Sequence, residues 1–208
     1  RPEVLVGAVH GDRALVGLVS AVERLHQCGL PGAVLADDRM DRPGADFFRV
    51  VRQIRDRLGA NPVLLQLPIG TADGFKGVID LVMMTAIYWD DAGHGVRFER
   101  AGIPSAMLNL AQEYREKLIE SAADGNESLL KKYLESGNLS PVEIRQGLRL
   151  RTLRSEVLPV TCGSAFRNAG VQAVLDAIVE YLPSPADKPP IIGILENGEA
   201  GTRIVSDE

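Results

Sequence analysis

The sequence predicts an α/β fold in which an incomplete, mostly parallel sheet is interrupted by an α+β insert. Three observations support this prediction. A short apolar run ends in a polar loop, residues 35–46, and an amphipathic helical pattern follows it. The same succession returns around residues 157–168, and the residues between the two junctions combine short strands with three consecutive helices. Because α/β sheets bind ligands at the carboxyl ends of their strands, the two polar loops are the predicted functional region.

The beginning of the chain is predicted to form a β-α-β unit followed by a second helix. The expected elements are a strand over residues 4–9, a helix over 13–28, a strand over 32–36 and a helix over 46–58. The strands are short apolar runs, and the helices repeat apolar side chains every three or four positions. Asp12 is a suitable N-cap for the first helix, while Gly29 and Gly59 are stop signals for the two helices.

The insert is predicted to begin with strands and to continue with helices. Residues 62–68 form a strand bracketed by prolines, which favours a sheet edge or the first strand of a new sheet. A long apolar stretch covers residues 77–87, residues 96–99 alternate like a half-exposed strand, and a hairpin turn is expected at 90–95 between them. Three helices follow, over residues 104–123, 126–135 and 140–153. The last opens with a capping box, Ser140 to Glu143, and has proline at its first helical position.

The end of the chain is predicted to return to the first sheet and then to leave it. A strand over residues 157–161, a polar loop over 162–168 and a helix over 171–182 repeat the βα pattern. Four prolines within residues 183–190 break regular structure, as in a linker. Residues 191–195 could start a strand of a following domain.

Composition excludes several classes of protein. The net charge of -5 and pI of about 5.3 argue against direct DNA binding through bulk electrostatics. Cys28 and Cys162 make no metal-binding pattern and fit reduced thiols in a cytoplasmic protein. The absence of a roughly 20-residue apolar run or a signal-peptide layout predicts no membrane association. No histidine pair has ligand spacing and no nucleophile motif occurs, so neither a catalytic residue nor a metal ligand is predicted.

Eight separate blocks of this sequence resemble translation elongation factor G. In chain order they are residues 41–47, 57–62, 67–70, 77–80, 86–89, 160–168, 170–173 and 181–185. The resemblance extends from Asp41 to about Leu195, whereas residues 1–37 share only the strand–helix–strand outline. It implies the second half of a P-loop-NTPase-like GTP-binding domain with that factor's inserted subdomain. The implied division is a partial α/β nucleotide-binding domain at 1–60, an insert at 61–155, a return at 156–185 and a linker at 186–208.

The resemblance also implies a guanine-binding site in the two polar loops. The family reads guanine with Asn-Lys-x-Asp, and Asp38, Arg39, Met40 and Asp41 occupy these positions. Asp41 keeps the carboxylate that accepts from the N1 and N2 hydrogens of the base, and Arg39 can mimic the lysine stem. Asp38 departs from the pattern, because an ionised carboxylate only accepts hydrogen bonds and would face guanine acceptors. An exocyclic amine such as that of adenine would suit Asp38 instead.

In the second loop, Ser164, Ala165 and Phe166 match the segment whose backbone amide supports the guanine O6 in this family. A backbone donor does not depend on the side chain, so this contact is expected to survive. The resemblance therefore implies a weakened GTP or GDP site.

The phosphate-binding and magnesium motifs of the family are missing from the sequence. A P-loop needs Gly-x-x-x-x-Gly-Lys-Ser/Thr, and no Gly-Lys pair occurs anywhere in the chain. The Asp-x-x-Gly segment that continues into a histidine is also absent, so no Mg²⁺ site is evident. The resemblance implies a GTPase, yet this chain is not expected to hydrolyse GTP. The sequence fits either a fragment joined to foreign sequence or a divergent relative, and its abrupt apolar start suggests a piece of something longer.

Two functions follow from these observations. The first is a portion of an elongation factor G-like GTP-binding domain, whose parent drives ribosomal translocation. The alternative is a non-catalytic module that docks the ribosomal stalk protein through the insert, as the resemblance implies. The charges on the insert helices also fit an ordinary solvated surface. They are Arg115, Lys117, Lys131, Lys132, Arg145, Arg149, Arg151 and Arg154, interspersed with Glu113, Glu116, Glu120, Glu127 and Glu143.

Overall fold

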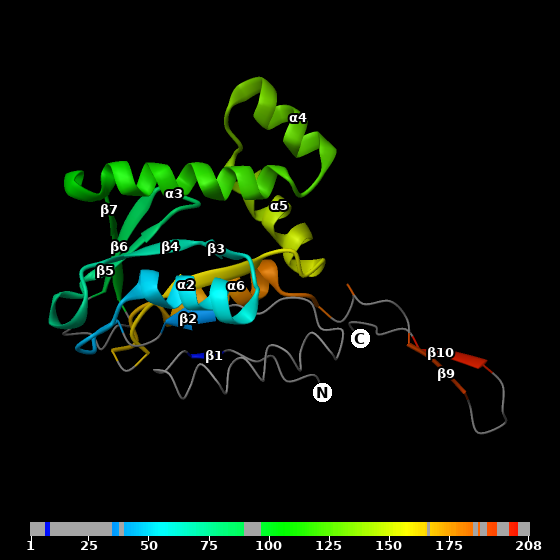
Figure 1. The fold of residues 1–208 in the computed structure, drawn as a ribbon, viewed down its shortest axis with the longest axis horizontal. Helices are drawn as coiled ribbons and strands as arrows, with labels where there is room; N and C mark the ends of the chain where they lie inside the picture. Colours follow the sequence, from blue (N-terminus) through cyan, green and yellow to red (C-terminus); the bar gives the residue numbers. More distant parts are fainter. Residues whose placement is uncertain are drawn as a thin grey trace.

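The structure is a computed structural model that describes residues 7–8, 35–37, 40–89, 97–165, 167–184, 187, 191–194 and 200–203. The helix predicted over residues 13–28 and the hairpin turn predicted over 90–95 lie outside these residues. Every helix in the described ranges is too short or too polar to cross a membrane. The fold combines a parallel and an antiparallel sheet (Figure 1), which confirms the predicted α/β class with an α+β insert.

The parallel sheet has four strands in the order β1-β2-β8-β3. They are β1 (Gly7–Ala8), β2 (Leu35–Asp37), β8 (Leu158–Cys162) and β3 (Pro62–Leu64), and every neighbouring pair is parallel. All five residues of β8 are buried, because it is an inner strand and helices pack near it. This burial explains why the segment is a continuous apolar run rather than an alternating one.

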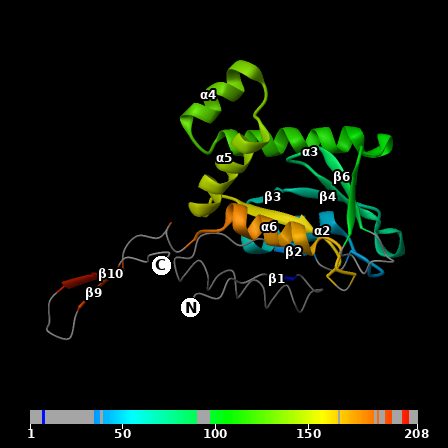
Figure 2. The same cartoon turned by 180° about the vertical axis from the view of Figure 1, so that it is seen from behind.

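Two helices cover opposite faces of the parallel sheet. Helix α2 (Phe47–Leu58) lies in front of the sheet in Figure 1, and α6 (Val171–Tyr181) lies in front of it in the reverse view of Figure 2. The boundaries of α2 agree with the sequence signals. The Asp46 carboxylate accepts a hydrogen bond from the Arg49 amide at 2.9 Å, and Gly59 ends the helix with a φ of 61°.

The single strand predicted over residues 62–68 is wrong, because the chain changes sheets within it. Strand β3 pairs with β8, whereas β4 (Gln66–Ile69) pairs with β5 (Gly77–Asp80) in the antiparallel sheet. At the crossing, the Leu65 amide donates to the Val160 carbonyl at 2.9 Å and the Leu65 carbonyl accepts from Leu81 at 2.9 Å. Both strands lie at sheet edges, as the two prolines predict.

The antiparallel sheet and helix α3 form the first part of the insert. The sheet order is β4-β5-β6-β7, with β6 at Thr85–Trp89 and β7 at Phe98–Ala101. Helix α3 (Ser105–Ala123) runs along this sheet (Figure 1). The Arg115 guanidinium fastens the helix to the turn between β5 and β6 by donating to the Leu81 and Val82 carbonyls, both at 2.6 Å.

Helices α4 (Glu127–Ser136) and α5 (Pro141–Leu153) complete the insert. Helix α5 crosses α3 very closely at Gly147, where a side-chain carbon added to the glycine would lie 2.1 Å from the Ala122 carbonyl oxygen. Only glycine permits this approach between the two backbones. The neighbouring side chains Leu118, Ile144 and Leu148 are buried at 1% exposure or less, so the crossing is part of the core.

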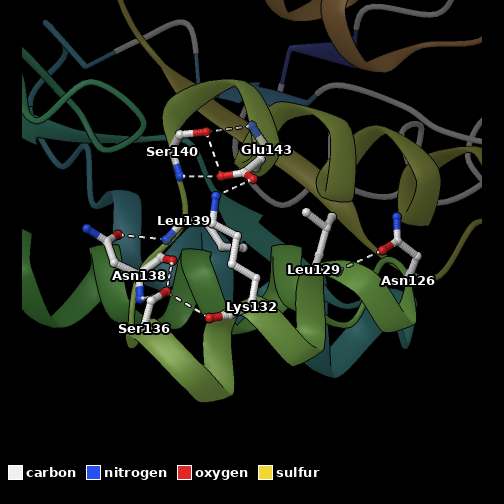
Figure 3. Close-up of polar contacts among 8 residues, drawn as sticks. All are labelled: Asn126, Leu129, Lys132, Ser136, Asn138, Leu139, Ser140 and Glu143. Atoms are coloured by element: carbon white, nitrogen blue, oxygen red, sulfur yellow. Dashed lines mark hydrogen bonds and ion pairs between the residues drawn. The ribbon is translucent and has the colours of Figure 1, made fainter.

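The predicted capping box is present at the start of α5 (Figure 3). The Glu143 carboxylate accepts from the Ser140 amide at 2.9 Å, while the Ser140 hydroxyl oxygen accepts from the Glu143 amide at 3.4 Å. Glu143 also binds Lys132 of α4, with 2.6 Å between the ammonium and the carboxylate. The Lys132 bond and the Ser140 bonds lower the pKa of Glu143 from its usual 4.5 to about 2.

A Glu143→Gln variant is expected to flatten the acid dependence of stability. Because the folded-state pKa of Glu143 is lowered, its contribution is complete above about pH 4.5 and is lost as the pH falls toward about 2. The melting temperature of the original chain should therefore fall more steeply across this window than that of Glu143→Gln. Thermal unfolding at several pH values checks this, with Glu116→Gln on the exposed face of α3 as control. Parallel curves for Glu143→Gln and the original chain would contradict it.

The last described strands form a separate hairpin. Strands β9 (Ile191–Ile194) and β10 (Ala200–Arg203) pair antiparallel and project away from the other elements in Figures 1 and 2. Strand β9 agrees with the strand expected to start near residue 191.

Candidate functional site

The two polar loops leave neighbouring strands of the parallel sheet. Strands β2 and β8 pair in parallel, with Asp37 opposite Cys162 as the last pair of the register. The loops that follow therefore start side by side at the same edge of the sheet. The Met40 amide donates to the Gly163 carbonyl at 3.0 Å, which joins the two loops through their backbones.

Asp41 and Ser164 are brought into direct contact. The Ser164 hydroxyl donates to Oδ1 of Asp41 at 2.7 Å, although the two residues are 123 positions apart. Ser164 is fully buried and Asp41 is half-buried, so a protected hydroxyl holds a carboxylate that reaches the surface. Within the described part of the chain, this is the one hydrogen bond to the Asp41 carboxylate. One carboxylate oxygen, Oδ1, is thus fixed, whereas Oδ2 accepts no hydrogen bond from any residue that the structure describes.

The local structure of the second loop fixes the direction of the Ser164 hydroxyl. Ser164 and Ala169 form a narrow antiparallel bridge, with amide-to-carbonyl distances of 2.8 and 2.9 Å. Inside this turn, the Arg167 amide donates to the Ser164 oxygen at 3.3 Å, so the hydroxyl proton is left to point at Asp41. Gly163 is required before the turn, because a side-chain carbon there would lie 2.5 Å from the Ala169 carbonyl oxygen.

The structure describes three of the six predicted site residues. Asp41 and Ser164 meet, and Ala165 follows them as an exposed residue at the tip of the turn. Asp38, Arg39 and Phe166 lie outside the described residues.

Sequence reasoning missed two residues that assemble the site through their backbones. Met40 is fully buried and links the loops, and Gly163 supplies the carbonyl that it binds. One sequence signal marks Met40, since it is an apolar residue in a run of charged ones.

The arrangement is suited to the recognition of a hydrogen-bond donor. A carboxylate held by a hydroxyl accepts hydrogen bonds from a planar group that presents adjacent N–H donors. Among the residues that the structure describes, no three histidine, cysteine or carboxylate side chains gather as metal ligands would. Cys162 is buried at the end of β8 and contributes no exposed thiol.

Comparisons with known proteins place both loops in one family match. The family model of the elongation factor Tu GTP binding domain matches residues 5–184. This match begins well before Asp41, where the sequence resemblance was limited to the outline of the elements. Among solved structures, the crystal structure of a Thermus thermophilus protein is similar with a TM-score of 0.67 and 25% sequence identity. The similarity covers 89% of this chain and 26% of that protein, so the chain spans about a quarter of its length.

Proposed function

Because the chain belongs to the elongation factor Tu GTP-binding domain family, we propose that it binds the guanine base of GDP or GTP between the Asp41 and Ser164 loops. The hydrogen bond from the Ser164 hydroxyl to Asp41 carries this proposal. It holds the carboxylate in place before any ligand arrives, which lowers the ordering cost of binding. The parent protein that we propose is an elongation factor G-like translational GTPase of the cytoplasm, acting in ribosomal translocation.

In the proposed complex, the Asp41 carboxylate accepts from N1–H and N2–H of guanine. A backbone amide of residues 164–166 donates to O6, and the Arg39 side chain lies along the base and sugar. Guanine presents the adjacent N–H groups that this carboxylate is placed to receive, whereas adenine presents one amine and an acceptor nitrogen at the corresponding edge. We therefore expect a preference for GDP over ADP in spite of Asp38.

The phosphates contribute little to the proposed complex. The sequence has no Gly-x-x-x-x-Gly-Lys-Ser/Thr segment, whose backbone amides and lysine would hold them. Nor does it contain the family's magnesium-binding segment. We therefore propose binding of GTP and GDP with similar affinity, independent of Mg²⁺ and without hydrolysis by this chain.

A Ser164→Ala variant tests the proposal. Loss of the hydroxyl removes the bond that orients Asp41, and one hydrogen bond of about 1 kcal/mol corresponds to roughly fivefold weaker GDP binding. Isothermal titration with GDP measures this, with circular dichroism to establish that the variant is folded. The matched control is Ser140→Ala, which removes an N-cap hydroxyl of the insert and should leave GDP affinity unchanged. Equal GDP affinity in Ser164→Ala and the original chain would count against the proposed site.

A second candidate function is docking of the ribosomal stalk protein by the insert. The observation that favours it is the exposure of large apolar side chains on α4 and α5, where Leu134 is 76% and Val142 is 70% exposed. The ion pair between Lys132 and Glu143 links these two helices (Figure 3). Titration of the chain with purified stalk protein, repeated with Leu134→Ser, tests this function, which predicts weaker binding by the variant.

A further inference from the structure

Besides the hydrogen bonds to Ser164 and Gly163, a third hydrogen bond helps to place Asp41, and its donor belongs to the insert. The amide of Ala72 donates to the Met40 carbonyl at 2.8 Å. Ala72 begins the 3₁₀ helix η1 (Ala72–Gly74) in the loop of residues 70–76, which joins β4 to β5 of the antiparallel sheet. The Met40 carbonyl is part of the same planar peptide group as the Asp41 amide. A bond to this carbonyl therefore sets the orientation of the backbone that enters Asp41.

The loop is built to hold the Ala72 amide in one place. Ala72 has a φ of +52°, the left-handed region that residues other than glycine seldom adopt. Its carbonyl accepts from the Phe75 amide at 3.0 Å, and Phe75 is buried at 5% exposure. Gly70 packs so tightly against the returning chain that a side-chain carbon would lie 1.9 Å from the Gly74 carbonyl oxygen. Strained backbone of this kind persists where the surrounding structure fixes it, and here it aims an N–H at Met40.

Met40 is thus fixed on both sides by elements from different sheets. Its amide donates to Gly163 at the end of the parallel sheet, and its carbonyl accepts from Ala72 of the insert. Its side chain is fully buried, so Met40 is packed into the core. The two backbone bonds and the Ser164 hydroxyl together determine where the Asp41 carboxylate lies.

We infer that residues 70–76 of the insert position Asp41 for base recognition, through the hydrogen bond from the Ala72 amide to the Met40 carbonyl. This inference rests on the proposed function and adds a positioning residue to it. Guanine affinity then depends on the insert, and by linkage a partner that displaces the 70–76 loop changes the affinity for the base.

The test removes the Ala72 N–H without changing the side chain. Replacing Ala72 by lactic acid, through nonsense suppression, converts the amide into an ester and deletes the donor. The matched control replaces Gly74 by glycolic acid, which deletes the amide that donates to the Thr71 carbonyl at 3.0 Å within the same loop. Calorimetric titrations with GDP and IDP provide a readout of Asp41 itself, because IDP lacks the 2-amino group that Asp41 is proposed to accept from.

The original chain should prefer GDP to IDP by about tenfold, since one hydrogen bond to a charged group is lost in IDP. The ester at position 72 should reduce this preference to within about twofold, and the ester at position 74 should preserve it. A loss of stability alone would weaken the binding of both nucleotides equally and leave the ratio of their affinities unchanged. An unchanged ratio for the ester at position 72 would overturn the inference while leaving the base site intact. Absence of a GDP preference in the original chain would instead overturn the proposed function.

Discussion

An Asp41→Asn variant is expected to bind GDP at least about a hundredfold more weakly than the original chain. The carboxylate accepts from both N1–H and N2–H of guanine, whereas an amide offers one acceptor and places an NH₂ group against a donor. Unpaired donors in a site built for hydrogen bonds carry a cost of several kcal/mol, which corresponds to this loss or more. The Ser164 hydroxyl can still donate to the amide oxygen, so the loop should keep its structure. Calorimetric titration measures the change.

The same variant should gain affinity for XDP, by roughly tenfold. Xanthine has a carbonyl where guanine has its 2-amino group, and the new amide can donate to that oxygen. The control is Asp46→Asn, five residues further on, since asparagine also caps a helix and α2 should be unaffected. Asp46→Asn should leave both affinities unchanged. If Asp41→Asn lowered the affinities for GDP and XDP to the same extent, Asp41 would support the fold rather than recognise the base.

A Gly147→Ala variant is expected to unfold at a temperature roughly 4–8 °C lower. Alanine is the better helix former by about 1 kcal/mol, which would favour the change in an exposed helix. Here the added carbon would lie 2.1 Å from the Ala122 carbonyl oxygen and 2.8 Å from its carbon. Two backbones must move apart to admit it, and overpacking of this kind costs up to about 3 kcal/mol. The clash should therefore outweigh the gain in helix propensity.

Differential scanning calorimetry checks the Gly147 prediction. The control is Gly102→Ala, because a side-chain carbon at Gly102 has no neighbour within 4 Å and should change the melting temperature little. A Gly147→Ala protein as stable as the control would mean that α3 and α5 do not cross as closely as the structure has them. GDP affinity should be nearly unchanged in both variants, because the crossing joins α3 and α5 and involves neither the two site loops nor residues 70–76.

The elements with local signals could be predicted from the sequence. Helix α2 lies between a capping aspartate, Asp46, and a left-handed glycine, Gly59, and helix α5 opens on the Ser140 capping box. Each signal lies within a few residues of the boundary that it sets. The change of sheet at Leu65 could not be predicted, because residues 62–68 form an apolar run that Gln66 alone interrupts, with no turn signal at Leu65. The two hydrogen-bond partners of Leu65, which are Val160 and Leu81, are determined by the tertiary fold.

The candidate site also combines features that could be predicted from the sequence with features that could not. That the Asp41 and Ser164 loops lie close together follows from parallel strands whose carboxyl ends meet at one edge. The sequence marks Met40 only as an apolar residue among charged ones. It could not indicate that Met40 and Ala72 join the loops, since both act through backbone groups that every residue possesses. The positive φ of Ala72 could not be predicted from the sequence either, because alanine has no preference for that conformation.

We propose that these two loops bind guanine without a phosphate clamp. Isothermal titration of the chain with GDP and with ADP, each with and without Mg²⁺, tests this proposal. We expect micromolar binding of GDP, unaffected by Mg²⁺, and much weaker binding of ADP. No heat with either nucleotide would mean that the loops bind no base, and would leave the insert as the functional surface.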